Sequence, residues 1–198
     1  MPITYTNRKG VTYHLCRGVT KAGKSRYYFA REPKGEALDE IPPGFKISES
    51  VNGVVSLMHD RPSPLWPEEV AAVESAVKRH PKAHNYRVGA KGDRIVVYER
   101  VGPDTQDLLT EFSRWGPFSP GQVRGLQEML DRHAHFTPVL RFILADAERR
   151  AFRAERWCYL GSIDDWIYIG GRGLVDQLAN ELIPALGTVT NSLSCIRR

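Results

Sequence analysis

The sequence predicts an α+β protein with a basic N-terminal β-meander and hairpins, a middle part made of a helix and a β-hairpin, and an α+β C-terminal unit. Three observations lead to this prediction. Residues 1–60 alternate apolar and polar side chains between turn signals, which is the period of β-strands. Proline-containing start signals precede apolar residues at helical spacing. Strand-like segments then return near the C-terminus.

The composition excludes several classes of protein. The chain has 198 residues, of which 41% are apolar and 26% charged, as is ordinary for a globular protein with a substantial core. No apolar run approaches the roughly 18 residues of a membrane span, and the N-terminus lacks the apolar core of a secretory signal. We therefore expect a soluble, cytoplasmic protein without a membrane partner.

The three cysteines give no sign of a disulfide framework or a cysteine-rich zinc site. Cys16, Cys158 and Cys195 are far apart in the sequence and form no C-x-x-C pair. We expect each thiol to be a small buried side chain.

The net charge of +5 belongs to the N-terminal half. Residues 1–102 contain 17 Lys and Arg against 11 Asp and Glu, whereas residues 103–198 contain 11 against 12. Every lysine lies in the first half. An anionic partner is therefore expected to bind there.

The N-terminal meander is predicted to have three strands, over residues 3–7, 11–19 and 25–30. Turns are predicted at Arg8-Lys9-Gly10 and Lys21-Ala22-Gly23-Lys24, where Gly23 supplies a positive φ. From Arg8 to Lys34 there is one acidic residue, Glu32, and there are eight basic residues: Arg8, Lys9, Arg17, Lys21, Lys24, Arg26, Arg31 and Lys34.

This basic and aromatic meander suits contact with nucleic acid, with Lys and Arg on phosphates and aromatic rings against bases or sugars. Over about thirty residues it resembles the small β-sheet arms at the N-termini of tyrosine recombinases, which implies contact with DNA. The predicted nucleic-acid-binding residues are Arg8, Lys9, Arg17, Lys21, Lys24, Arg26 and Tyr27.

An alternative interpretation needs no partner. Turns take solvated lysines, edge strands use lysine against aggregation, and the tyrosines are half-buried core residues. Exposure of Tyr13, Tyr27 and Tyr28 on a basic face would favour nucleic acid, and burial of all three would count against it.

Further hairpins and one helix are expected before Pro103. Asn52-Gly53 predicts a hairpin that extends the first sheet to five strands, with strands 45–48 and 54–58. A helix is predicted from Trp66-Pro67 to about Arg79, with Val70, Val73 and Val77 as its apolar stripe, and a hairpin of strands 85–90 and 93–99 follows. Pro103 is the predicted boundary.

The second half is predicted to contain helices and then strands. Ser119-Pro120 starts a helix whose core face is Val123, Leu126 and Leu130. Thr137-Pro138 repeats the start signal before Leu140, Ile143, Leu144, Ala147 and Ala151, although residues 139–144 also fit a strand.

On the helical interpretation, Arg149, Arg153 and Arg156 form a basic ridge, neutralised by nearby acidic residues or able to hold phosphate. Strands over 157–160 and 163–169 and a helix over 174–186 ending at Gly187 complete the unit. The predicted segments are thus 1–60, 61–102, 103–187 and a loose tail, 188–198.

Gly170-Gly171-Arg172-Gly173, between a strand and a helix, is a candidate phosphate site. Exposed amides at a helix N-terminus and an arginine bind phosphate, so Gly171, Arg172 and Gly173 are the predicted cofactor-binding residues. The loop resembles the R/Q-x-x-G-x-G pyrophosphate loop of coenzyme A-dependent acyltransferases, but Tyr168 stands where that motif has Arg or Gln. The other interpretation is a plain turn.

Three pairs of residues have side chains that can bind a metal ion or act in acid–base chemistry. Asp164 and Asp165 point to opposite faces if they lie on a strand. His133 and His135 are placed at a helix-to-helix junction, and Pro81 separates His80 from His84 at a helix end. We therefore predict no metal site and no bound cofactor, and no catalytic motif is present in the sequence.

The sequence thus favours a non-catalytic protein that binds nucleic acid, or another polyanion, through its basic N-terminal sheet. Two alternatives stay open. One is an enzyme that uses a phosphate-bearing cofactor, a nucleotide or coenzyme A, at Gly170–Gly173. The other is a scaffold for protein–protein interaction.

Overall fold

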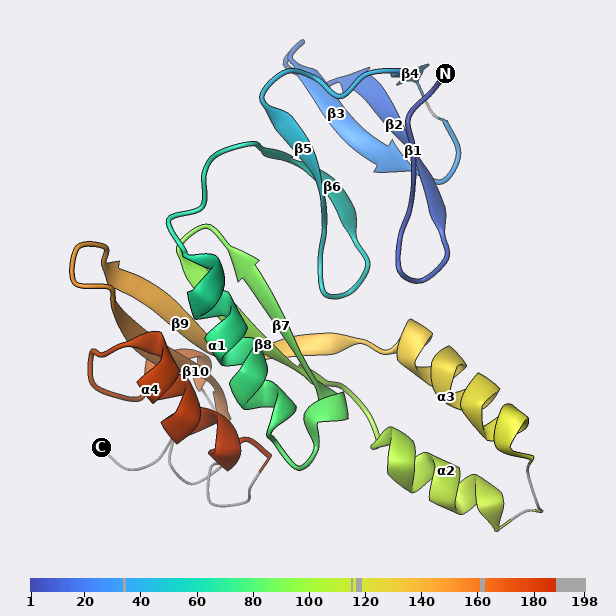
Figure 1. The fold of residues 1–198 in the computed structure, drawn as a ribbon. Helices are drawn as coiled ribbons and strands as arrows, with labels where there is room; N and C mark the ends of the chain where they lie inside the picture. Colours follow the sequence, from blue (N-terminus) through green and yellow to red (C-terminus); the bar gives the residue numbers. More distant parts are fainter. Residues whose placement is uncertain (34, 115, 117–118, 161–162, 188–198) are drawn as a thin grey trace. The chain divides into compact units, whose positions relative to one another are not determined.

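The computed structural model describes residues 1–33, 35–114, 116, 119–160 and 163–187 (Figure 1). It contains helices and antiparallel sheets, which confirms the predicted α+β class. The chain divides into two compact units, Met1–Pro62 with Thr105–Ala134, and Ser63–Asp104 with the described part of His135–Arg198. They are called unit 1 and unit 2 below. The four segments predicted from the sequence stay a prediction, and residues 188–198 lie outside the described part.

The predicted three-stranded meander is present in unit 1. Its antiparallel strands, in the order β1-β2-β3, are β1 (Thr4–Thr6), β2 (Thr12–Val19) and β3 (Ser25–Ala30). A two-residue strand, β4 (Glu36–Ala37), also pairs with β2. The sequence signalled only a polar link there, because two residues show no period.

The second hairpin of unit 1, β5 (Phe45–Glu49) and β6 (Val55–His59), forms a sheet of its own. The expected extension of the first sheet to five strands is therefore wrong. The hairpin contacts the meander through side chains instead of backbone hydrogen bonds. The Tyr27 ring packs edge-on against Phe45 at 5.8 Å between centroids, and the Tyr5 hydroxyl donates to Glu49 Oε2 at 2.9 Å.

Unit 1 also contains helices α2 (Thr105–Ser113) and α3 (Pro120–His133), which contact each other. Helix α3 starts as predicted, because Ser119 Oγ accepts from the Gln122 amide and Gln122 Oε1 accepts from the Ser119 amide. Its predicted core face is only half-buried, at Val123, Leu126 and Leu130. Helix α2 was not predicted.

Unit 2 is built on a five-stranded antiparallel sheet in the order β11-β10-β9-β8-β7. Its strands are β7 (Tyr86–Lys91), β8 (Arg94–Arg100), β9 (Phe136–Asp146), β10 (Ala151–Leu160) and β11 (Ile163–Tyr168). Its helices are α1 (Pro67–Lys78), α4 (Val175–Leu182) and the short 3₁₀ helices η1 (Ala83–Asn85) and η2 (Ile183–Ala185).

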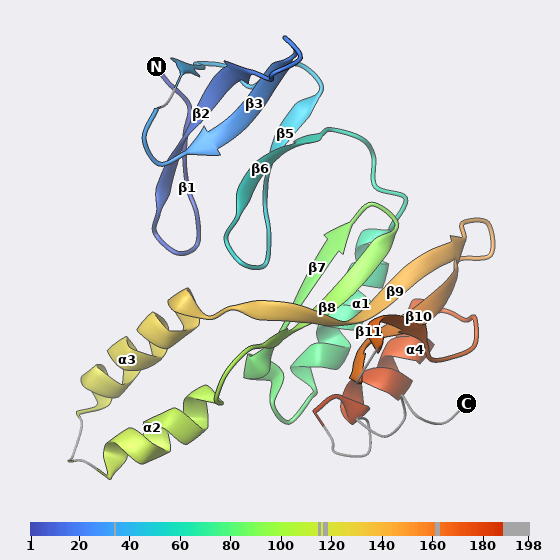
Figure 2. The same ribbon diagram turned by 180° about the vertical axis from the view of Figure 1, so that it is seen from behind.

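Helices α1 and α4 lie on the same face of this sheet (Figure 1), and the view from behind shows the opposite face (Figure 2). The core under the helices includes Val73, Ile95, Phe142, Phe152 and Ile183, each with none of its surface exposed. Gly187 lies two residues after the end of η2, and its φ of 71° fits the predicted stop. None of the described helices is both long and apolar enough to cross a membrane.

The helix predicted after Thr137-Pro138 is wrong, and the strand alternative is right. Residues 136–146 form β9, between β8 and β10 in the middle of the sheet. Pro138 lacks an amide hydrogen, and it lies where the register of β8 and β9 shifts between Val97 and Tyr98. A proline is tolerated at such an irregularity. Long-range pairing thus overrides the local start signal.

The basic ridge of Arg149, Arg153 and Arg156 is wrong for the same reason. Arg153 and Arg156 lie on β10, opposite Ile143 and Leu140 of β9 respectively. Three residues apart on a strand, their side chains point to opposite faces of the sheet.

A bidentate ion pair ties α1 to the turn between β9 and β10. Arg150 Nε donates to Glu69 Oε1 at 2.8 Å, and Arg150 Nη2 donates to Glu69 Oε2. Glu69 Oε2 also accepts from the amide of Trp66, the residue before the helix, at 2.8 Å. Both charged side chains are about nine-tenths buried. Arg150 has a φ of 50°, and its guanidinium lies 4.1 Å from the centre of the Trp66 ring.

Replacing Glu69 with alanine should lower the free energy of unfolding of unit 2 by about 3 kcal/mol, because it leaves the Arg150 charge buried without its partner. Chemical denaturation measures this. Glu68→Ala is the matched control, since Glu68 is the exposed neighbour in the same helical turn, and it should cost about 0.5 kcal/mol. Equal effects of the two changes would contradict this account of the pair.

Tyr86 is a buried tyrosine whose hydroxyl donates to Glu99 Oε1 at 2.8 Å. Burial is the largest cause that raises the pKa of Tyr86 well above its ordinary value, and the hydrogen bond to Glu99 adds to it. Its stabilising contribution is therefore complete below the ordinary tyrosine pKa and is lost as the pH rises through the folded-state pKa.

Unit 2 should become less stable above about pH 10, because the unfolded chain then loses the Tyr86 proton while the folded chain keeps it. Tyr86→Phe should show a smaller decline in unfolding temperature between pH 9 and pH 11 than the unchanged protein. The other tyrosines contribute equally to both proteins and cancel in the comparison. Parallel declines would show that Tyr86 does not cause the loss.

Candidate nucleic-acid interface

The seven predicted nucleic-acid-binding residues do not form one patch. Arg8 and Lys9 lie in the turn between β1 and β2, whereas Lys21 and Lys24 lie in the turn between β2 and β3. These turns are at opposite ends of β2, which has eight residues and is therefore roughly 25 Å long. The predicted site is thus two separate clusters.

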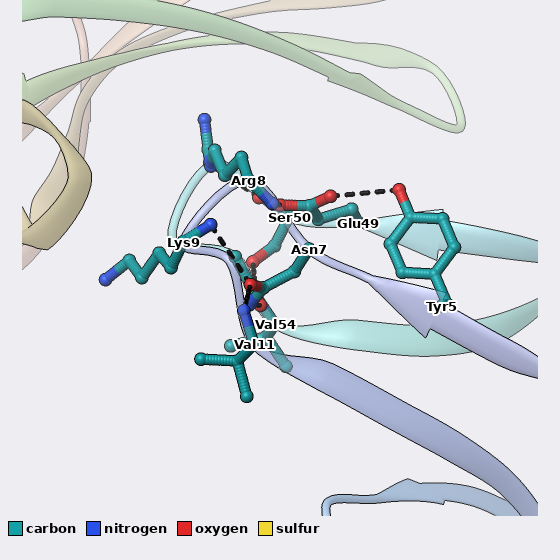
Figure 3. A network of polar contacts seen from close by, with 9 residues as sticks. Tyr5, Asn7, Arg8, Lys9, Val11, Glu49, Ser50 and Val54 are labelled. Atoms are coloured by element: carbon teal, nitrogen blue, oxygen red, sulfur yellow. Dashed lines mark hydrogen bonds and ion pairs between the residues drawn. The ribbon is translucent and has the colours of Figure 1, made fainter.

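The cluster at the β1–β2 end is organised by Asn7, which is 5% exposed (Figure 3). Asn7 Oδ1 accepts from the amides of Lys9 at 3.0 Å and Val11 at 2.9 Å. Asn7 Nδ2 donates to the Gly53 carbonyl at 2.6 Å, so it joins this turn to the β5–β6 turn. Gly53 has a φ of 76° there, and a Cβ would come within 3.1 Å of Asn7 Nδ2.

Arg8 belongs to the same contact between turns. Its Nη2 donates to the Ser50 carbonyl at 2.6 Å, and its amide donates to Glu49 Oε1 at 3.0 Å (Figure 3). Its Nε lies 3.5 Å from Glu49 Oε1, and the other Glu49 oxygen accepts from Tyr5. This hydrogen bond is the largest cause that raises the pKa of Tyr5. The Arg8 charge is offset by Glu49, and its contacts stabilise the fold of unit 1.

The cluster at the β2–β3 end differs from the one at the β1–β2 end in its exposure and its contacts. Lys21, Lys24 and Arg26 are exposed, and their side chains make no hydrogen bond or ion pair with any residue that the structure describes. The Thr20 hydroxyl accepts from the Lys24 amide at 3.1 Å and the Thr20 carbonyl accepts from the Gly23 amide at 2.9 Å, which fixes the turn. The charges are therefore held on a defined hairpin and face solvent.

Arg17 extends this cluster along β2. Its guanidinium donates to Ser25 Oγ at 3.3 Å and lies 4.0 Å from Glu36. Both charged side chains of that pair are about half exposed or more, so the pair is weak. Arg17, Lys21, Lys24 and Arg26 together are called the hairpin cluster below.

The tyrosines are neither on an exposed basic face nor fully buried, and their half-burial agrees with the interpretation that needs no partner. Tyr13, Tyr27 and Tyr28 are all half-buried. The edge of Tyr27 is engaged with Phe45, so this ring packs within unit 1. The hairpin cluster therefore presents exposed charges, whereas these three aromatic rings are only partly accessible for stacking.

The Gly170–Gly173 loop offers fewer amides than the sequence implied. The Gly173 amide donates to the Phe152 carbonyl at 3.1 Å, and the Phe152 amide donates to the Gly173 carbonyl at 2.8 Å. Gly171 and Arg172 are exposed. The binding of a phosphate-bearing cofactor by Gly171, Arg172 and Gly173 stays a prediction.

His80 and His84 contact different partners, and Asp164 and Asp165 are neighbours on β11, where successive side chains point to opposite faces. His80 Nε2 contacts the Leu186 carbonyl at 3.2 Å, whereas His84 Nε2 contacts Asp104 at 2.8 Å. His133 ends α3 and His135 precedes β9, so the junction joins a helix to a strand and not to a second helix. Among the described residues, no three His, Cys, Asp or Glu side chains gather as for a metal ion. Cys16 and Cys158 are buried, as expected, and form no disulfide among the described residues, and Cys195 lies outside the described residues.

Unit 2 contains a cavity of about 320 Å³ beside the Glu69–Arg150 pair. Its lining is mainly apolar and includes the exposed side chains of Trp66 and Leu174, with Glu68 and Asp176 at the N-terminal turns of α1 and α4. Nothing in the sequence pattern indicated it, because the lining residues come from three distant segments.

Comparison with protein-family models, with curated proteins and with solved structures finds no match.

Replacing Asn7 with alanine should lower the free energy of unfolding of unit 1 by about 2 kcal/mol, because it leaves one buried carbonyl and two partly buried amides without this partner. Thr6→Ala is the control, since Thr6 Oγ1 contacts only the exposed Thr12 hydroxyl in the cross-strand pair, and it should cost less than about 1 kcal/mol. Urea titration of both variants measures the difference. An Asn7→Ala effect as small as the control's would refute the role of Asn7 in joining the turns.

Proposed function

We propose that this protein binds nucleic acid, without catalysing a reaction, through the hairpin cluster of its N-terminal sheet. The observation that supports this most directly is the set of exposed cations on the β2–β3 turn, Lys21, Lys24 and Arg26, which lack partners among the described residues. Unpaired cations attract phosphate because no internal carboxylate competes for them.

The shape of the cluster fits a duplex. A two-stranded β-ribbon enters the major groove of B-DNA, which is about 12 Å wide. Strands β2 and β3 are neighbours, about 4.8 Å apart, and their turn projects Lys21 and Lys24. Arg17 and Arg26 lie further along the two strands, where they can reach the phosphates that flank a groove.

The predicted residues lie in two separate clusters, and the proposal concerns only one of them. Arg8 and Lys9 lie at the other end of β2, and Arg8 is engaged with Glu49. The binding surface is therefore the β2–β3 end alone, with four cations. Neutralising two of these on duplex DNA should change the slope of log affinity against log salt by about 1.8.

Reversing two lysine charges, Lys21→Glu with Lys24→Glu, should reduce duplex affinity at low salt at least tenfold and flatten the salt dependence by about two contacts. Fluorescence anisotropy with a labelled mixed-sequence duplex, titrated from about 20 to 200 mM salt, measures both quantities.

The control for this test is the double change Lys78→Glu with Arg124→Glu, which alters the net charge equally at exposed positions outside the hairpin cluster. It should keep most of the affinity. If the unchanged protein shows no affinity at low salt, or if the two double variants weaken binding equally, the proposal fails.

A further inference from the structure

The five-stranded sheet of unit 2 has two faces of opposite chemistry. Side chains alternate along each strand, and the face under α1 and α4 takes the buried set, including Ile95, Val97 and Phe142. The residues between them point to the other face, which Figure 2 presents to the viewer. Among the described elements of unit 2, no helix covers that second face, which is called the open face below.

The open face is strongly basic. The strand register places six basic residues on it, namely Arg87, Lys91, Arg94, Arg100, Arg141 and Arg153. The same register places three acidic residues there among the described strands, Asp146, Glu155 and Asp164. Four of these basic residues come from residues 1–102, the half of the sequence that carries the positive net charge, and two come from residues 103–198.

The cations are spread over the sheet, and several remain accessible. Arg94 and Arg153 both neighbour Ile143, on either side of β9, and their side chains are 51% and 44% exposed. Arg94 lies 3.3 Å from Asp93, and Arg153 lies 3.3 Å from Glu155. The pair of Arg94 and Asp93 is exposed and therefore weak, so Arg94 can exchange its carboxylate for a phosphate. Glu155 is nearly buried and is also bound by Arg141, so it keeps a partner if Arg153 turns to a phosphate.

Aromatic side chains lie beside these cations. Trp157 and Trp166 pair across β10 and β11, with ring centroids 5.3 Å apart and planes at 81°. The Arg141 guanidinium lies over the Trp166 ring at 4.1 Å and is held there by the ion pair with Glu155. Tyr168, two residues after Trp166 on the same face and 50% exposed, presents a ring to solvent.

The width of the open face fits single-stranded nucleic acid better than a duplex. Five strands at about 4.8 Å make a surface about 19 Å wide, which is too wide for the major groove of about 12 Å. Unpaired bases instead lie flat on such a sheet and stack on its rings, while arginines bind the phosphates.

We infer that the open face is a second binding surface, and that its ligand is single-stranded nucleic acid, with bases on Tyr168 and the Trp166 region and phosphates on Arg94 and Arg153. It differs from the hairpin cluster in unit, in residues and in mode of contact. The inference does not rest on the proposed function, and each stands or falls by its own variants.

The test uses the full chain and labelled single strands of about a dozen nucleotides, a thymidine strand, a uridine strand and an abasic deoxyribose strand of the same length. Tyr168→Ala should weaken binding of the thymidine and uridine strands about tenfold, whereas Tyr168→Phe should stay within about twofold of the unchanged protein. The affinity for the abasic strand should not change in Tyr168→Ala, since this strand has no base to stack. Comparing the thymidine and uridine strands tells DNA from RNA.

A second pair of changes tests the phosphate contacts without touching an aromatic ring. Arg94→Ala with Arg153→Ala should flatten the slope of log affinity against log salt by about 1.4 for a single strand. Lys21→Glu with Lys24→Glu should retain the Tyr168 dependence of single-strand binding.

Two results would overturn the inference. One is single-strand affinity unchanged in both the Tyr168→Ala and the Arg94→Ala, Arg153→Ala proteins. The other is abasic strand bound as tightly as the thymidine strand, which marks a surface that recognises polyanions without bases. Loss of duplex binding in the Lys21, Lys24 variant bears only on the hairpin cluster, so the two proposals fail separately.

Discussion

The burial of one face of the unit 2 sheet under α1 and α4 is the constraint on which the rest of that unit depends. Once Ile95, Val97, Phe142 and Phe152 face the helices, the period of two leaves every intervening side chain on the open face. A slip of one residue would bury arginine and expose the core. The same hydrophobic burial that stabilises unit 2 therefore also fixes the position of its basic and aromatic residues.

The charged side chains of the two units make different kinds of contacts. In unit 1, Glu49 offsets Arg8, and Asn7 satisfies the backbone of two turns, so the β1–β2 end is committed to the fold. The β2–β3 end has only the weak contacts of Arg17, and its lysines face solvent. In unit 2, the Arg141–Glu155 pair holds a guanidinium against the Trp166 ring. Some cations of this chain are thus held by internal contacts, and others face solvent.

Polar pairs between distant segments hold these arrangements together. Glu69 and Arg150 are 81 residues apart, and Tyr5 and Glu49 are 44 apart. In each case a carboxylate accepts hydrogen bonds from two different elements, which satisfies its charge where water has little access. The strained φ of Arg150 is compatible with the fold because its guanidinium also packs against Trp66. Such pairs leave no local signal, since neither partner shows a pattern in its own neighbourhood.

The sequence by itself determined the α+β class, the N-terminal meander, the hairpin around Asn52-Gly53, helix α1 and the start of α3, because turn residues, capping residues and short periods act locally. It misassigned residues 137–156 as helical, since apolar residues there fit both periods and only pairing with β8 and β10 selects the strand. It named the basic residues of the meander but not their separation onto two ends of β2. Tertiary structure alone decided which cations are paired, and it alone assembled the open face, because that face is defined by the register of strands from segments some forty residues apart.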